Sequence, residues 1–162
     1  MATTTLSRAL IVASLAAAAV TLSGCSLIGN AINGAVTGED NVFSLKVGSC
    51  MNDYGSETEI TSVPIVECSE PHDTEIYAAS SVEGDEYPGL EAVQTQADKE
   101  CLAAFEGFVG LSYDDSVLYY STLYPSDESW GSGDREILCG ISKYDENEQI
   151  VKVTGSLKGV AE

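Results

Sequence analysis

The residues best suited to chemistry lie in one short stretch, residues 67–77, which reads ECSEPHDTEIY. It contains His72, the only histidine of the chain, beside Asp73 and four residues after Cys68. A histidine next to an aspartate could be a general base, a metal ligand or a structural hydrogen-bonding group. Because Pro71 fixes the backbone before it, we expect a packed histidine whose Nδ1–H is held by Asp73 or another nearby acid.

A second group of candidate residues lies in residues 125–139, PSDESWGSGDREILC. Trp130, the only tryptophan, sits in what reads as a Ser/Gly/Asp loop, where it could cap the core or stack on a ligand. Arg135 is the only arginine besides Arg8. In so acidic a chain we expect a carboxylate partner for its guanidinium, with Asp73, Glu75 and Asp134 as candidates. His72, Trp130 and Arg135 are therefore the candidate interaction residues.

No set of catalytic residues stands out in the sequence. The chain has no Gly-x-Ser-x-Gly elbow, no phosphate-binding glycine loop and no His-Glu-x-x-His motif. No spacing selects a serine to act with His72, or a carboxylate pair among the 26 acidic residues. We expect no catalytic residue, no cofactor and no enzymatic activity, with a hydrolase that uses His72 as the open alternative.

The N-terminus reads as a cleaved export signal. Arg8 precedes a short apolar run, which ends in LSGC at residues 22–25, and a bilayer span would need roughly 20 apolar residues. LSGC resembles the bacterial lipobox, in which the cysteine thiol receives a diacylglycerol before cleavage and the new amino group is often acylated, for example with palmitate. Two or more acyl chains give stable anchoring. We predict a lipoprotein signal peptide at residues 1–24 and lipidation of Cys25.

The chain has five cysteines, an odd number, and lipidation would use Cys25. Four then remain, Cys50, Cys68, Cys101 and Cys139, and outside the cytoplasm they read as two disulfides. Three pairings are open. Local order favours Cys50 with Cys68 and Cys101 with Cys139. A zinc site is disfavoured because no two cysteines are close enough in sequence for a C-x2-C pair, so no metal is expected.

The charge of the chain excludes some partners. Seven Lys and Arg residues stand against 26 Asp and Glu residues, a net charge of −19. Cleavage would remove Arg8 and no acidic residue, which makes the balance more negative. Such a field repels nucleic acid and anionic lipid headgroups. We expect a solvated acidic surface and no nucleic-acid partner.

The elements that must position these residues form a small α+β domain. Residues 25–41 are rich in Gly, Asn and Ala and read as the lipidated cysteine and a flexible tether. Strand-like alternation or β-branched runs follow in six segments, and a helix lies among them. The predicted strands are 42–51, 61–68, 74–82, 116–125, 135–144 and 149–157. Residues 69–72 read as a hairpin turn and residues 144–149 as a polar turn.

One amphipathic helix is expected within residues 87–110. Its apolar residues recur at three- and four-residue steps. They are Leu90, Val93, Ala97, Cys101, Ala104, Phe105 and Phe108. Pro88 suits the first turn, and Gly107 or Gly110 suits the end. The fold class is therefore one helix packed on an antiparallel sheet of about five to six strands, with two disulfides.

Four pieces of the sequence recur in the order of a known family. They are VGSC (47–50), VECSEPHDTEIYA (66–78), CLAAF (101–105) and PSDESWGSGDREILC (125–139). The chain thus resembles the septum formation family over roughly residues 42–144. The resemblance implies an extracytoplasmic domain of an actinobacterial membrane protein or lipoprotein, with a loose association with septum formation. It implies no chemistry.

Two functions follow as expectations. The first is an interaction domain, residues 42–162, lipid-anchored on the extracytoplasmic face of the cell membrane. It would bind an envelope protein or wall component and be linked to septum formation or cell division. The second is a small-ligand or solute-binding lipoprotein with a cleft near Trp130 and Arg135. An exposed tyrosine-rich strand face around Tyr119 and Tyr120 would favour the first, and a buried apolar pocket the second.

Overall fold

The computed structural model describes residues 40–52, 60 and 62–161. They all belong to the same unit of the chain. The predicted signal peptide, Cys25 and the predicted tether up to residue 39 lie outside the described residues. The first described element is a short strand, β1 (Asp40–Asn41). It consists of the last two residues of the predicted tether, which are therefore part of the folded domain.

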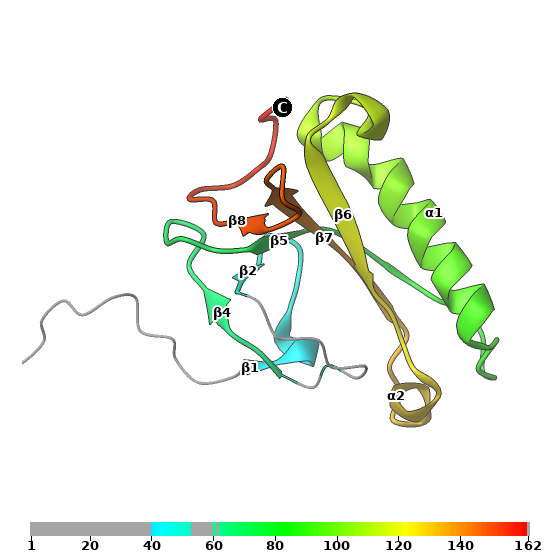
Figure 1. The fold of residues 1–162 in the computed structure, drawn as a ribbon. Helices are drawn as coiled ribbons and strands as arrows, with labels where there is room; N and C mark the ends of the chain where they lie inside the picture. Colours follow the sequence, from blue (N-terminus) through cyan, green and yellow to red (C-terminus); the bar gives the residue numbers. More distant parts are fainter. Residues whose placement is uncertain (1–39, 53–59, 61, 162) are drawn as a thin grey trace, which may run out of the picture. The chain divides into compact units, whose positions relative to one another are not determined.

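An antiparallel sheet forms the centre of the domain (Figure 1). Its strands run in the order β4-β2-β5-β7-β6, and β8 pairs with the end of β7. The strands are β2 (Cys50–Met51), β4 (Ile65–Val66), β5 (Thr74–Ser81), β6 (Leu118–Leu123), β7 (Glu136–Tyr144) and β8 (Ile150–Val151). A separate pair joins β1 to β3 (Ser62–Val63). The predicted α+β class is confirmed, with one long helix on this sheet.

Helix α1 (Leu90–Val109) covers one face of β5, β6 and β7 (Figure 1). Its buried stripe follows the predicted steps of three and four residues. The stripe is Val93, Ala97, Cys101, Phe105 and Val109. Gly110 ends the helix with φ 91°, a left-handed backbone conformation that glycine adopts without strain.

Two details of the predicted helix are wrong at its N-terminal end. Leu90 is 55% exposed rather than buried, since it is the first helical residue and lies beyond the reach of the core. Pro88 precedes the helix instead of lying in its first turn, because Gly89, with φ 94°, is the N-cap. The left-handed φ of Gly89 turns the chain into the helix, which places Pro88 outside it.

The N-terminal part of the sheet departs most from the predicted strands. Residues 42–51 were expected to form one strand, but they form a 3₁₀ turn at Val42–Ser44 and then only the two residues of β2. Asn41 caps that turn through its side-chain oxygen, and Gly48 breaks the run with φ 89°. The predicted hairpin across residues 69–72 is also wrong, because β2 lies between β4 and β5 and pairs with both.

Alternate side chains of the central strands build two cores on opposite faces of the sheet. Toward α1, Ile137, Cys139 and Ile141 of β7 join the helix stripe and Tyr77 of β5. On the other face, Leu138 packs with residues of the N-terminal part. That second cluster is Leu45, Met51, Val63, Ile76 and Leu138. The period of two along β7 therefore divides one strand between two packed layers.

The C-terminal segment, residues 152–161, fastens distant parts of the domain together. Val153 exchanges two backbone hydrogen bonds with His72, each 2.9 Å long. Farther along, the Gly159 N–H donates to the carbonyl of Phe108 and the Ala161 N–H to that of Val109, at 2.8 and 3.1 Å. These last two bonds satisfy carbonyls at the end of α1 that have no partner within the helix. The segment thus joins the start of β5 to the end of the helix.

Candidate functional site

His72 is a buried structural residue in this fold. It is 0% exposed, and its backbone forms the bridge to Val153. Its Nδ1–H donates to the backbone carbonyl of Glu70 at 2.9 Å, so the predicted carboxylate partner is wrong. The ring bonds to a carbonyl two residues back in the same turn, and the Asp73 side chain forms an ion pair with Lys152. The ring therefore orders the turn before β5.

The second ring nitrogen of His72 is the one buried polar side-chain atom without a hydrogen-bond partner among the described residues. A general base or a metal ligand must reach a substrate or an ion. Within the described ranges, no group of three His, Cys, Asp or Glu residues is arranged to hold a metal ion. With its ring enclosed, His72 has no open path to a substrate in this structure.

A row of buried polar residues follows His72 along β5. Asp73 pairs with Lys152 through oxygen and nitrogen atoms 2.9 Å apart, and the Thr74 hydroxyl bonds to that of Ser142 at 2.8 Å. Glu75 is 3% exposed. Its two carboxylate oxygens accept hydrogen bonds from the Ser156 hydroxyl and the Leu157 N–H, both 2.7 Å long. The polar side chains of this row find their partners in the C-terminal segment and in β7.

Trp130 and Arg135 form a cluster at the other end of β5. The predicted loop around Trp130 is a short helix, α2 (Asp127–Gly131), whose capping box links Ser126 and Ser129. Trp130 is 6% exposed, and its indole N–H donates to the Asp85 carbonyl at 3.2 Å. It therefore caps the core, one of the two roles expected for it.

Arg135 lies over Trp130, with its guanidinium carbon 3.5 Å from the centre of the ring. Its Nη1 donates to the backbone carbonyls of Trp130 and Asp134, at 2.9 and 2.6 Å. The expected ion pair is not found among the described residues, so that prediction is wrong. The reason is geometric: the turn after α2 leaves main-chain carbonyls facing the guanidinium, while the Asp134 carboxylate accepts from Ser129 and the Glu136 N–H.

The structure does not bring the three candidate residues together. His72 lies just before β5, whereas the carbonyl of Arg135 accepts from Val82, just after it. The eight residues of β5 span roughly 25 Å at about 3.3 Å per residue. His72 thus belongs to one cluster, and Trp130 with Arg135 to another.

Both predicted disulfides are confirmed. Cys50 is bonded to Cys68, and Cys101 to Cys139. The first ties β2 to the turn before His72, and the second joins the centre of α1 to β7. Tyr77 reinforces the second, since its hydroxyl donates to the Cys101 carbonyl at 2.6 Å. Burial, with smaller contributions from nearby tyrosines, raises the pKa of Tyr77 well above its ordinary value.

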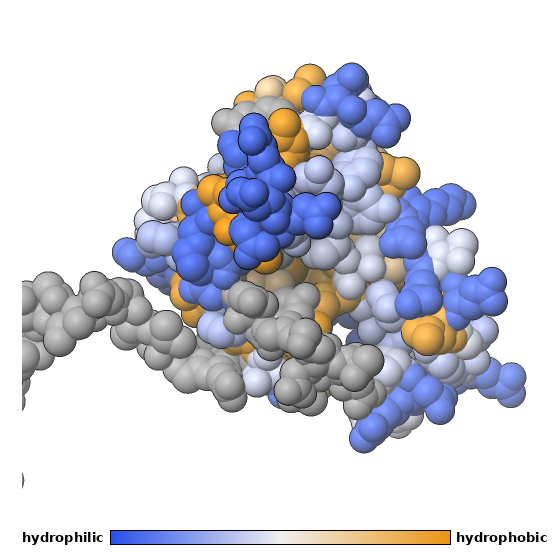
Figure 2. All heavy atoms as spheres, in the orientation of Figure 1, coloured by the Kyte–Doolittle hydropathy of each residue, from blue (hydrophilic) through white to orange (hydrophobic). Residues whose placement is uncertain are grey.

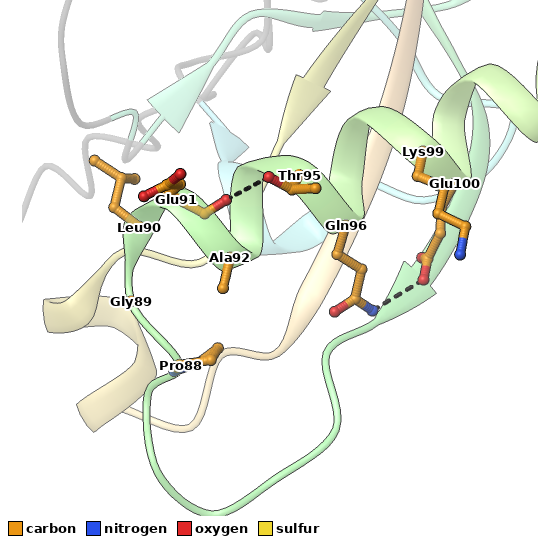
Figure 3. A pocket seen from close by; sticks show the side chains of 9 residues that line it. All are labelled: Pro88, Gly89, Leu90, Glu91, Ala92, Thr95, Gln96, Lys99 and Glu100. Carbon is orange, nitrogen blue, oxygen red and sulfur yellow. Dashed lines mark hydrogen bonds between the residues drawn. The ribbon is translucent and has the colours of Figure 1, made fainter.

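An open groove lies beside the first turns of α1 (Figure 3). Its volume is about 860 Å³. It is lined by Pro88, Gly89, Leu90, Glu91, Ala92, Thr95, Gln96, Lys99 and Glu100. Two of the polar groups are already bonded within the helix, Gln96 to Glu100 and the Thr95 hydroxyl to the Glu91 carbonyl. The groove contains none of the three candidate residues, and its open form differs from the buried apolar pocket that a small-ligand site would need.

Exposed aromatic side chains gather where β6, β7 and β8 meet. Tyr119 is 50% exposed, Tyr144 37% and Ile150 38%. The rings of Tyr119 and Tyr144 are 5.3 Å apart in an edge-to-face arrangement. Tyr120, which the sequence grouped with Tyr119, turns to the helix side. Tyr144 and Ile150 were not predicted to be exposed. The alternation along residues 135–144 and the polar turn after them are the signals that could have identified them as exposed.

The fold and its clusters define a disulfide-linked α+β domain whose candidate polar residues are used to hold the chain together. A family model described as septum formation matches residues 47–162. The chain belongs to the septum formation family. The match includes all four disulfide cysteines, the three candidate residues and the C-terminal segment, so it continues past residue 144, where the resemblance ended. No curated protein and no solved structure matches the chain.

Membership of this family supports a link to septum formation. Within the described ranges, no helix combines the length and the apolar composition that crossing a bilayer requires.

Proposed function

We propose that the chain is a lipid-anchored interaction domain on the extracytoplasmic face of the cell membrane, where it binds an envelope protein or wall component during septum formation. The exposed face formed by Tyr119, Tyr144 and Ile150 is the observation that carries this proposal. Tyrosine is enriched in protein interfaces because one side chain offers both apolar area and a hydroxyl. Among the described residues, the other aromatic rings are buried or partly buried, apart from Phe43, which is 58% exposed.

Two further observations support the location outside the cytoplasm. Disulfides persist in oxidising compartments and are rare in the cytosol, and the domain has two. The signal sequence and LSGC at residues 22–25 then supply export and an anchor. With lipid on Cys25, the domain would start about 15 residues from the membrane, a contour of at most about 50 Å. This reach would keep the interacting face near the envelope.

The environment of the three candidate residues argues against a catalytic role for them. His72 is enclosed, and Arg135 and Trp130 cover each other and bond to main-chain groups. The alternative, a small-ligand-binding lipoprotein, was expected to use a cleft near Trp130 and Arg135. At 6% exposure the indole offers almost no face for stacking. No particular observation therefore favours the alternative.

Intact mass of the protein extracted from membranes tests the anchor. We expect a chain that starts at Cys25 and carries a diacylglyceryl group and an acyl chain. Cys25→Ser should move the protein out of the membrane fraction, whereas the neighbouring Ser26→Ala should not. An unmodified chain starting at Met1, in a cell that processes other lipoproteins, would contradict the anchor.

Photo-crosslinking in living cells tests the interaction. A photoreactive residue at Tyr119 should link the protein to an envelope component during division, and the same residue at Leu102, 46% exposed on α1, serves as the matched position. A fluorescent fusion should concentrate at the septum. If no position on the domain yields a crosslink and the fusion stays evenly distributed, the interaction role is wrong.

A further inference from the structure

The tyrosine surface, defined as Tyr119, Tyr144 and Ile150, is a single face by strand register. Tyr119 pairs with Ser142 across β6 and β7, and Tyr144 lies two residues farther on, so both side chains point the same way. Ile150 pairs directly with Tyr144. This is the face of β7 that carries Leu138, opposite α1. The tyrosine surface is therefore the uncovered end of a face whose other end is packed.

The hydroxyls of the two tyrosines are available to a partner. Within the part of the chain that the structure describes, neither the Tyr119 nor the Tyr144 hydroxyl makes a hydrogen bond. Three apolar groups side by side, each between about one third and one half exposed, differ from the scattered surface hydrophobics that need no explanation. An edge-to-face ring pair also holds its geometry before binding, so little side-chain entropy is lost on docking.

Acidic residues flank this surface in the chain. Asp114 and Asp115 follow Tyr113, whose ring centre lies 6.4 Å from that of Tyr119. The turn between β7 and β8 adds further exposed acids next to Tyr144 and Ile150. These are Asp145, Glu146 and Glu148. Figure 2 shows hydrophilic side chains gathered over the β7–β8 region, with hydrophobic ones beside them.

The acid that follows Tyr144 in the chain carries a fixed negative charge. Asp145 accepts backbone N–H bonds from Asn147 and Gln149, at 2.8 and 2.9 Å. These bonds hold the pKa of Asp145 below its ordinary value. Aromatic faces attract cations, and Lys or Arg stems also pack on apolar groups such as Ile150. Tyrosine rings with acidic residues beside them in the chain are complementary to a basic side chain on both counts.

We propose that the tyrosine surface docks a Lys/Arg-rich segment of a partner protein, whose basic side chains lie over Tyr119 and Tyr144 and face the flanking carboxylates. The proposal rests on the proposed function as an interaction domain and names the chemistry of the partner. It also explains how a chain of net charge −19 can associate with another protein rather than repel it.

Selection from a random peptide library tests the proposal. Peptides of about 12 residues, displayed on phage, are selected on the full-length protein purified in detergent with its disulfides intact. We expect enrichment of peptides rich in Lys and Arg. Their affinity should fall at least about tenfold for Tyr119→Ser and for Tyr144→Ser. The matched variant Leu102→Ser, which removes an exposed apolar side chain from α1, should leave it unchanged.

Two charge variants separate a local effect from the general acidity of the domain. Glu146→Gln with Glu148→Gln should weaken binding of the selected peptides several-fold. Glu91→Gln with Glu106→Gln removes the same charge from exposed positions on α1 and should have a much smaller effect. Raising the salt concentration from about 50 mM to about 500 mM should also weaken binding. Equal losses from the two pairs would overturn the proposal.

The other occupants of this face are also outcomes of the test. Selected peptides without basic residues, or insensitive to both tyrosine variants, overturn the proposal. So does a dimer in sedimentation that Tyr119→Ser dissolves, or binding of purified wall fragments that the same variant abolishes. If photo-crosslinks to an envelope protein form from Leu102 and not from Tyr119, the proposed function stands and this inference fails.

Discussion

Replacing Glu75 tests whether one buried carboxylate holds the C-terminal segment on the domain. Its two oxygens accept 2.7 Å bonds from the Ser156 hydroxyl and the Leu157 N–H, and its side chain is 3% exposed. Hydrogen bonds to a charged group contribute roughly 1.5–3 kcal/mol each. Glu75→Ala removes both and leaves a buried N–H without a partner, so we expect the free energy of unfolding to fall by about 3–5 kcal/mol.

Two milder variants at the same place calibrate the loss in free energy of unfolding. Glu75→Gln keeps one acceptor oxygen and should cost about half as much as Glu75→Ala. Ser156→Ala removes one donor at an exposed residue, where water can replace it, and should cost about 1 kcal/mol. Glu67→Gln, an exposed acid before the same strand, is the control for the change in charge and should be close to neutral.

Urea unfolding followed by tryptophan fluorescence measures these costs, because Trp130 is the only tryptophan and is buried away from Glu75. Hydrogen exchange adds a local readout at the Gly159 and Ala161 amides, which bond to the end of α1. In Glu75→Ala these amides should exchange faster than those of β7. A cost below about 1 kcal/mol for Glu75→Ala, or equal costs for Ala and Gln, would refute the reasoning.

Three other predictions concern packing, cross-links and pH. A Cβ on Gly140 would lie 2.7 Å from the Ser121 hydroxyl and 2.8 Å from a methyl of Thr74, so Gly140→Ala should cost about 1–3 kcal/mol in urea unfolding. Gly131→Ala, with nothing within 4 Å, should be neutral or stabilising, and equal costs would contradict the packing argument. The disulfides close separations of 18 and 38 residues, which the chain-entropy model values at about 3 and about 4 kcal/mol. Removing Cys101 and Cys139 together should therefore lower the thermal midpoint more than removing Cys50 and Cys68, and the reverse order would count against that model. Because the pKa of Tyr77 is raised above 10.0 in the folded state, the unfolded state holds fewer protons above that pH. Stability should be full below about pH 10 and should decline as the pH rises from there toward the folded-state pKa, and Tyr77→Phe should flatten the decline; an unchanged slope would exclude Tyr77 as its source.

Much of the fold could be predicted because its signals are local. The stripe from Val93 to Phe105 needs only the helical period, and Gly110 needs only its own backbone preference. The two disulfides join cysteines that are neighbours in sequence order. These features depend on few distant contacts, and all of them are present in the structure.

The remaining features depend on contacts between distant parts of the chain. The two residues of β2 are too short to show alternation, and their place between β4 and β5 is decided by pairing with both. Glu75 looks like any acid in a strand, and only the return of residues 156–157 makes it an anchor. Arg135 was assigned a carboxylate by charge, but the carbonyls that it meets depend on where α2 turns. For the tyrosine surface, alternation predicts two faces of β7 and does not say which end stays uncovered.

The bonds made by the C-terminal segment also bear on when the native domain can be completed. The contacts of Glu75 with Ser156 and Leu157 span 81 and 82 residues, whereas the disulfides span 18 and 38. If the chain crosses a membrane N-terminus first, the cysteines can pair while later residues are still in transit. The turn at His72 and the end of α1 must then wait, with open carbonyls and a buried acid lacking its donors, until almost the whole domain has emerged. Release from the export machinery, rather than formation of the cross-links, would then be the step that completes the native domain.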